Sequence, residues 1–332
     1  MNEPIIALDR IDKKFVKQLD VAEKLVNLVG GDRREEIVHA VDGVSLEIGE
    51  GEVVGLVGES GCGKSTLGRV VAGIHPPSGG TLSYRGRQVG DLDVDQAKAF
   101  ATKVQMIFQD PMSSLNPRLR VREIIGEAPR VHGQVAAAEL DDYVDQLLLR
   151  VGLDPSYKRR YPHQFSGGQR QRIGIARALA VKPDFLVCDE AVAALDVSIQ
   201  AQVLNLFMEL RKDLGLTYLF ISHDLGVVEH LADRVAVMYL GRIVEMSPTA
   251  ELFEKPNHPY TQALLAEIPR IDLRKRRFQP IKGEIPSPLD PPSGCHFHPR
   301  CPHATERCRT ERPALKAIGP GHLSACHLND VA

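Results

Sequence analysis

The sequence predicts an α/β fold with a parallel sheet at its centre. Residues 53 to 57 form an unbroken apolar run, typical of a strand buried on both faces, and a glycine-rich loop and a helical pattern follow it. Two more apolar runs, 185 to 188 and 218 to 221, are separated by apolar residues at helical spacing between 199 and 210. Strands and helices that alternate in this way indicate a parallel sheet, because parallel neighbours need a crossover between them.

A strand before this sheet region is half-buried. Val44, Leu46 and Ile48 alternate with polar residues, and residues 49 to 51 predict the turn that ends the strand. A polar, glycine-containing insertion over residues 16 to 38 separates this strand from an earlier one.

Two further segments complete the sheet domain. Residues 110 to 179 show helical periodicity and predict a mostly helical subdomain inserted into the domain. Residues 235 to 245 predict a hairpin that folds at residues 241 and 242.

The composition changes near residue 255, where Pro and His become frequent. We therefore predict one domain over residues 1 to 255 and a small irregular C-terminal domain over residues 256 to 332. The second has few periodic apolar runs and too little apolar material for a core of its own. Its basic residues Arg270 and 274 to 277 indicate a solvated linker, with contact to lipid headgroups or to a partner as the alternative.

Charge and hydropathy exclude several classes of protein. The 41 Lys and Arg residues nearly balance the 43 Asp and Glu residues, so no global positive field exists to hold nucleic acid or an anionic membrane. No stretch reaches the roughly 18 apolar residues of a membrane-spanning helix, and the first residues lack the pattern of a signal peptide. We therefore expect a cytosolic protein with reduced thiols.

Residues 58 to 66, the phosphate loop, fit the pattern G-x-x-x-x-G-K-[ST] between a predicted strand and a predicted helix. In this pattern backbone amides converge on phosphates, Lys64 bridges the β- and γ-phosphates, and the Ser65 hydroxyl binds Mg²⁺. The flanking strand and helix argue against a chance glycine-rich turn, so we predict that the chain binds a nucleoside triphosphate. The predicted binding residues are Gly58, Ser60, Gly61, Cys62, Gly63, Lys64, Ser65 and Thr66.

The apolar run at 185 to 188 ends in two carboxylates. Asp189 is predicted to hold Mg²⁺ through water, and Glu190 to polarise the water that attacks the phosphate. Alone, this pattern also fits a buried strand that ends in exposed acids. The phosphate loop upstream favours the hydrolytic interpretation.

A third motif opens the predicted helix after residue 165 with a serine N-cap and two glycines, whose amides suit phosphate oxygens. Its predicted binding residues are Ser166, Gly167, Gly168 and Gln169. Together with the phosphate loop, Gln109, His223 and residues 194 to 196, this motif resembles the signature of the ABC-transporter ATPases. The resemblance implies a P-loop NTPase core of the ABC ATPase type with an inserted helical subdomain.

The same resemblance implies a head-to-tail pair of ATPases, with ATP between the phosphate loop of one and the Ser166 motif of the other. Gln109 would bind Mg²⁺ or sense the γ-phosphate and relay its presence to a membrane partner. His223 would contact the γ-phosphate, and Asp196 would complete the site. Lys64, Gln109, Glu190 and His223 are the predicted catalytic residues.

Two features of this site are less regular. Phe15 is predicted to stack on adenine, with packing in the core as the alternative. The family usually has Pro and Ser after the carboxylate pair, where this chain has Ala191 and Ala193. Because the catalytic residues are all present, we expect hydrolysis.

The tail narrows the resemblance. Residues 258 to 265, 283 to 288 and 294 to 302 resemble the C-terminal extension of the oligopeptide and dipeptide importer ATPases, and residues 110 to 117 resemble the second ATPase of their pair. The resemblance implies two integral-membrane permeases, a homologous partner ATPase and an extracytoplasmic binding protein. It also implies a peripheral position at the cytoplasmic face of the membrane, without nucleic acid.

Four cysteines lie close together in this tail, spaced C-x5-C-x6-C-x17-C, which is wider than most structural zinc sites. Four thiolates suit a [4Fe–4S] cluster, which some members of the resembled subfamily carry in this extension. Zinc and free thiols are the alternatives. The predicted ligands are Cys295, Cys301, Cys308 and Cys326.

Two rival functions stay open on the sequence. A soluble ABC ATPase that remodels nucleic acid or ribosomes usually has two cassettes or a long coiled insertion, and this chain has neither. A non-catalytic partner that completes the site of another subunit is disfavoured by Glu190, whereas Ala191 and Ala193 keep it open. The sequence does not decide between a homodimer and a heterodimer.

Overall fold

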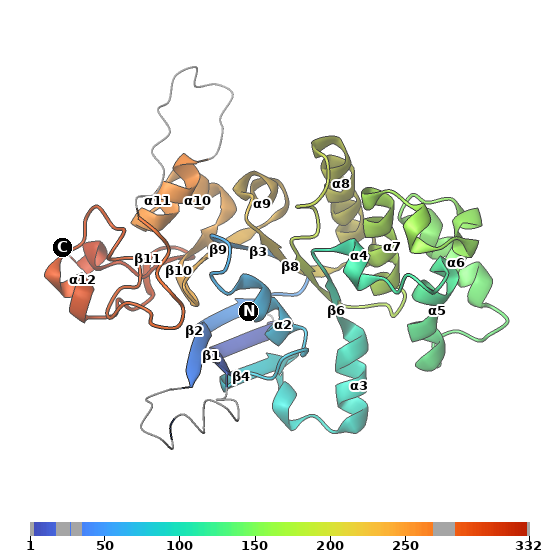
Figure 1. The fold of residues 1–332 in the computed structure, drawn as a ribbon, viewed down its shortest axis with the longest axis horizontal. Coiled ribbons are helices and arrows are strands. Elements are labelled where there is room, and N and C mark those ends of the chain that lie inside the picture. Colours follow the sequence, from blue (N-terminus) through green and yellow to red (C-terminus); the bar gives the residue numbers. More distant parts are fainter. Residues whose placement is uncertain (1–2, 18–26, 28–34, 268–282, 331–332) are drawn as a thin grey trace.

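The computed structural model describes residues 3–17, 27, 35–267 and 283–330 (Figure 1). Most of the insertion predicted at 16 to 38 and the whole basic run at 270 to 277 lie outside the described residues.

The larger sheet has eight strands within the described residues, in the order β11-β12-β10-β9-β3-β8-β7-β6. Strands β6, β7, β8, β3 and β9 are parallel, as predicted, and antiparallel strands extend the sheet beyond β9. The strands are β3 (Val53–Val57), β6 (Val104–Ile107), β7 (Phe185–Asp189), β8 (Thr217–Ser222), β9 (Arg234–Tyr239), β10 (Arg242–Pro248), β11 (Lys316–Gly319) and β12 (His322–Ser324).

The central strands are apolar throughout because both faces of this sheet are covered. In β3, Val53 and Val57 pack into one core cluster, whereas Val54 and Leu56 pack into another on the opposite face. Successive side chains of a strand point to opposite faces, so a strand covered on both sides has no solvent-facing position for a polar residue.

A smaller antiparallel sheet, in the order β2-β1-β4-β5, covers one face together with the first helices. The predicted half-buried strand is the end of β2, where Leu46 pairs with Leu8 and Ile48 with Ile6. These elements are β1 (Ile6–Lys17), β2 (Glu36–Ile48), β4 (Gly79–Tyr84), β5 (Arg87–Gln88), α2 (Lys64–Val71) and α3 (Val94–Lys103), with a short 3₁₀ turn at Val89–Asp91.

Helices cover the other face, and the predicted helical segment forms one end of the molecule (Figure 1). That end contains α4 (Pro111–Ser114), α5 (Val121–Val131), α6 (Leu140–Arg150) and α7 (Gly167–Leu179), with 3₁₀ turns at Pro155–Arg159 and Pro162–Gln164. The helices over the sheet are α8 (Val197–Leu214), α9 (Leu225–Leu231), α10 (Thr249–Glu254) and α11 (Pro259–Ala266).

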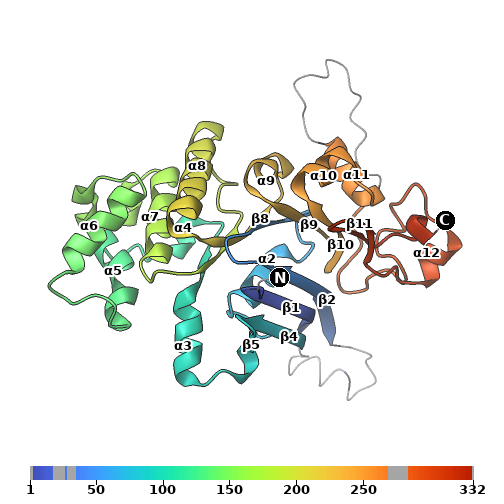
Figure 2. The same ribbon diagram turned by 180° about the vertical axis from the view of Figure 1, so that it is seen from behind.

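The residues after 255, the extension, build onto the sheet. The predicted hairpin is β9 and β10, which turns one residue earlier than expected because Leu240 and Gly241 carry the positive φ values. Strand β12 then pairs with the free edge of β10, and the view from behind shows β11 beside β10 (Figure 2). The rest of the extension is mostly turns, with α12 (Glu306–Thr310) and a 3₁₀ turn at His327–Asp330.

The extension shares the core of the larger sheet. Tyr260 and Phe297 are buried in the same cluster as the apolar residues of β3, β8 and β9. The tail therefore needs no core of its own, and its division into a second domain stays a prediction. None of the described helices is long and apolar enough to cross a membrane.

Candidate active site

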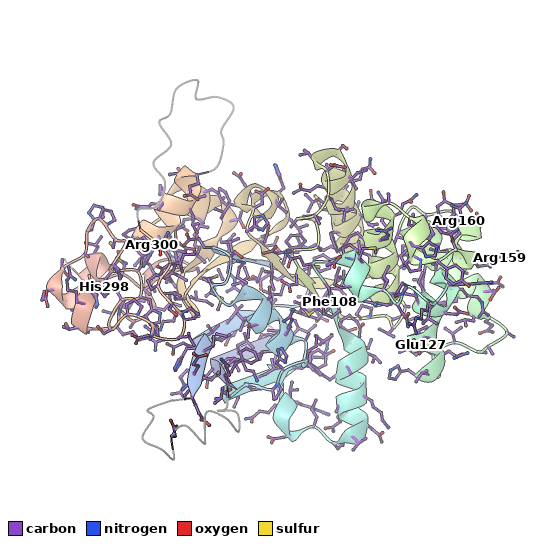
Figure 3. The ribbon with its side chains drawn as sticks, viewed as in Figure 1. Phe108, Glu127, Arg159, Arg160, His298 and Arg300 are labelled. Atoms are coloured by element: carbon purple, nitrogen blue, oxygen red, sulfur yellow. The ribbon has the colours of Figure 1, made fainter. Side chains whose placement is uncertain are left out.

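The carboxyl ends of four neighbouring parallel strands bring the predicted residues together. The phosphate loop follows β3, Asp189 and Glu190 end and follow β7, His223 follows β8, and Gln109 comes two residues after β6. Phe108, between β6 and Gln109, lies near the middle of the molecule (Figure 3). Binding sites of open α/β sheets lie at this edge, because the loops that leave the strands converge there.

The phosphate loop passes so close to its neighbours that two positions require glycine. Gly58 has φ 151°, and a Cβ there would lie 2.2 Å from the Met238 carbonyl oxygen. Gly63 has φ 108°, and its Cβ would lie 2.0 Å from the Ala40 carbonyl oxygen. Strands β9 and β2 therefore determine the path of the loop, and its tip at Ser60 and Gly61 is exposed.

Lys64 is the first residue of α2, and its side chain folds back over the loop. Its Nζ donates to the carbonyl oxygens of Gly58 at 2.7 Å and Glu59 at 2.9 Å, and the residue is only 4% exposed. The free N–H groups at the start of α2 and the Lys64 ammonium therefore face the same loop, which gives it a positive potential for an anion.

Ser65 and Asp189 meet beside the loop. The Ser65 hydroxyl donates to Asp189 Oδ1 at 2.8 Å, and Asp189 is 2% exposed. Burial raises the pKa of the Asp189 carboxyl. A hydroxyl and a carboxylate are hard oxygen donors of the kind that Mg²⁺ takes, so the pair fits that ion.

Glu190 lies next to these residues and contacts two of the other predicted ones. Gln109 Nε2 donates to Glu190 Oε2 at 2.6 Å, and His223 Nδ1 lies 3.3 Å from the same oxygen. The Glu190 backbone is in the left-handed region, with φ 48°, and its N–H donates to the Ile221 carbonyl oxygen at 3.0 Å. This unfavourable conformation is held by the sheet and turns the chain sharply after β7.

The Ser166 motif lies apart from these residues. Ser166 Oγ accepts from the Gln169 N–H at 3.3 Å, and Gln169 Oε1 accepts from the Ser166 N–H at 3.1 Å, which forms a capping box at the start of α7. Ser166 and Gly167 are exposed. Within the described part of the chain, no hydrogen bond or ion pair joins this motif to the phosphate loop.

The other predicted residues lie around the loop or at element ends. Phe15 is 40% exposed, which argues against its packing in the core, and its ring meets His75 edge-on at 5.6 Å between centroids. Cys62 is buried, and burial raises the pKa of its thiol. Thr66 lies in the first turn of α2, and Asp196 is the N-cap residue of α8.

Known proteins match the chain over nearly all of its length. A family model described as ABC transporter matches residues 41–193, and one described as oligopeptide/dipeptide transporter, C-terminal region, matches residues 244–308. The oligopeptide transport ATP-binding protein AppF of Bacillus subtilis is 52% identical over 295 residues, which cover 88% of this chain and 90% of AppF. The chain belongs to the oligopeptide and dipeptide family of ABC transporter ATP-binding proteins.

Other members and a solved structure agree. The dipeptide transport ATP-binding protein DppF of Haemophilus influenzae is 50% identical over 291 residues, 87% of this chain and 89% of DppF. A dimeric, post-hydrolysis structure of the ATP-binding cassette MJ0796 with ADP and Pi has a TM-score of 0.62 and 27% identity, over 74% of this chain and 98% of that one. The fold and family predicted from the motifs are confirmed, and this ABC ATPase is the energy-coupling subunit of a transporter.

The sequence motifs miss three residues of the ATPase that meet at the phosphate loop. Glu59 contacts Tyr260 and Arg300, which are separated from it by 201 and 241 positions and belong to the extension. The contacts depend on how the extension packs, so no local pattern signals them. The one available signal is that Tyr260 and Arg300 lie inside the tail segments that resemble the importer ATPases.

The four cysteines of the extension are near one another. Charge on any of their thiols is felt by the other three, and the Cys295 N–H donates to the Cys308 carbonyl oxygen at 2.8 Å. Burial raises the pKa of the Cys295 thiol to about 11. In the described ranges, no three His, Cys, Asp or Glu side chains are arranged so that they could hold a metal ion.

Proposed function

We propose that this ATPase drives the import of peptides. It would lie peripherally at the cytoplasmic face of the membrane against two permeases, with a homologous partner ATPase and an extracytoplasmic binding protein. The observation that carries the proposal is the meeting of Glu190, Gln109 and His223 beside the phosphate loop. The permease and peptide parts rest on the tail and on relatives named for oligopeptide and dipeptide transport.

The phosphate loop would bind the triphosphate of ATP. Lys64 would leave the carbonyl oxygens that it now contacts and pair with phosphate oxygens, while the amides at the start of α2 bind the same group. Ser65 and Asp189 would hold Mg²⁺, which offsets negative charge on the phosphates. Asp189 must be ionised for this task, and the neighbouring cations favour its ionised form.

Glu190 would accept the proton of the attacking water. Its carboxylate is only 11% exposed and is held through one oxygen by Gln109, with His223 beside it. Both neighbours come from other strand ends, so any movement of either would shift the carboxylate. Gln109 leads into α4, and His223 lies between β8 and α9. A shift at the helical end of the molecule is therefore coupled to the orientation of Glu190.

A second ATPase would complete the site. Ser166 and Gly167 are exposed at the start of α7, away from the loop of their own chain, so they are free to meet the phosphate loop of a partner. Phe15 offers an exposed aromatic face for adenine. The dimeric MJ0796 cassette with ADP and Pi supports a paired arrangement.

Purification of the tagged full chain from detergent-solubilised membranes tests this function. Mass spectrometry should find two hydrophobic permeases, a second ATPase and a binding protein, none of which should come with the tag alone. The ligand of the recovered binding protein then identifies the substrate. Recovery of ribosomal or DNA-associated proteins without membrane proteins would contradict the transport function and leave the ATPase chemistry in place.

For the extension we propose a [4Fe–4S] cluster on Cys295, Cys301, Cys308 and Cys326, with zinc and free thiols as the alternatives. Four grouped thiols match the ligand chemistry of the cluster, although their side chains would have to reorient to bind it. Chain purified without oxygen should contain iron and acid-labile sulfide, and Cys308→Ser should lose both. Cys188→Ala, which removes a thiol from β7, is the control. Zinc without iron, or neither metal, would contradict the cluster.

A further inference from the structure

Glu59, the second residue of the phosphate loop, is held from three sides. Its N–H donates to the Tyr260 hydroxyl oxygen at 2.8 Å, and its carbonyl oxygen accepts from Lys64 Nζ at 2.9 Å. Its carboxylate accepts two hydrogen bonds from Arg300, at 2.7 Å and 2.9 Å. Two of the three partners therefore belong to the extension, and the third is the lysine of the loop.

The Arg300 contact is buried and directional. The Arg300 side chain is 4% exposed and lies at the border between the extension and the strands of the larger sheet (Figure 3). Two parallel bonds from a planar guanidinium set both the position and the tilt of a carboxylate, which a single ammonium does not do. Because the pair is shielded from water, removal of one partner leaves the other as an unpaired charge.

A rigid aromatic cluster fixes the two partners from the extension. Tyr239, Tyr260 and Phe297 pack with ring centroids between 4.7 and 5.4 Å apart, and Arg300 lies 5.8 Å from the centre of the Tyr239 ring. The Arg300 N–H also donates to the Phe297 carbonyl oxygen at 3.0 Å. The extension thus presents the guanidinium and the phenol from a packed surface rather than from a loose tail.

From these contacts we propose that Arg300 and Tyr260 are positioning residues of the ATP site. They hold Glu59, and through its carbonyl oxygen Lys64, in the conformation that receives the phosphates. A loop ordered in advance loses less entropy when the nucleotide binds, so its affinity is higher. The inference rests on the proposed binding of ATP at this loop and gives the extension a task inside the ATP site itself.

A simpler role for Arg300 predicts a different result. If Arg300 only neutralised the Glu59 carboxylate beside the phosphates, removal of both side chains would restore the affinity for ATP. If Arg300 positions the loop, removal of both leaves the loop as poorly held as removal of one. The double variant therefore separates the two roles.

The experiment measures the dissociation constant for MgATP on the full chain, well below the melting temperature of each variant. Arg300→Met and Glu59→Ala should each weaken binding about tenfold, the order expected when a charge-assisted pair is lost. The double variant should bind no better than either single variant. Arg300→Lys keeps the charge without the two-bond geometry and should fall between Arg300→Met and the wild type, which provides a second test if Arg300→Met does not fold.

Arg312→Met is the matched control, because Arg312 also joins the extension to the body of the protein. It pairs with Asp42 on β2 at 3.4 Å and is half-exposed, away from Glu59. Its loss should lower the melting temperature slightly and leave the affinity for MgATP unchanged.

Three results would overturn the inference while the ATPase function stands: unchanged affinity in Arg300→Met and Arg300→Lys, wild-type affinity in the double variant, or equal weakening by Arg312→Met. A wild-type chain that does not bind MgATP would instead contradict the proposed function. The two failures are therefore distinguishable.

Discussion

Glu190→Gln should slow ATP hydrolysis at the site that contains it by about 10²- to 10⁴-fold, the contribution of a positioned general base. Glutamine keeps the size of the side chain and still accepts from Gln109 Nε2, but it cannot take the proton of water. Binding of MgATP should persist, since no contact of the phosphate loop is removed. Phosphate release by the reconstituted pair, with the change in this chain alone, measures the effect.

The control for this variant is Glu209→Gln, which removes a carboxylate from the exposed side of α8. It should leave turnover unchanged. Wild-type turnover by the Glu190→Gln pair would show that this chain completes the site of its partner without hydrolysing ATP itself, which is the rival that Ala191 and Ala193 keep open.

Gly63→Ala should abolish MgATP binding and lower the free energy of unfolding. Alanine at φ 108° is strained, by about 1–2 kcal/mol even in the more accessible left-handed region, and the new Cβ would lie 2.0 Å from a backbone oxygen of β2. A backbone oxygen in a strand cannot rotate away, so either the loop or β2 has to move. Equilibrium titration with MgATP and unfolding in denaturant measure the two effects.

Gly174→Ala is the matched control, because Gly174 lies inside α7 and its added Cβ would meet no atom within 4 Å. We expect normal MgATP binding and a stability raised by about 0.5–1 kcal/mol, since alanine is the better helix former. Normal MgATP binding by Gly63→Ala would show that the loop does not need the observed backbone conformation.

The sequence predicted the site well wherever a strand end and a motif coincide. Lys64, Asp189, Glu190 and His223 each follow an apolar run that is long enough to identify, and parallel strands place their carboxyl ends at one edge. Convergence therefore follows from the strand pattern alone. The sequence could not predict which of them touch, because the 2.6 Å contact between Gln109 and Glu190 depends on side-chain rotation at the ends of two strands.

The extension was less predictable. Strands β11 and β12 have four and three residues, too few for an alternating pattern, and they form because β10 offers an unpaired edge. The Arg300 contact with Glu59 depends in turn on that packing. Interactions that exist only after two distant segments have docked leave no periodic trace in either segment.

The pairing of β12 with β10 also bears on how the chain folds during synthesis. Strands β9 and β10 form a tight hairpin and meet early, whereas β12 joins only after the intervening extension has closed as a loop, which costs entropy before any pairing is gained. Until then β10 is an open edge that carries apolar side chains such as Ile243 and Met246. The nascent chain is therefore most prone to aggregate between the emergence of β10 and the arrival of β12.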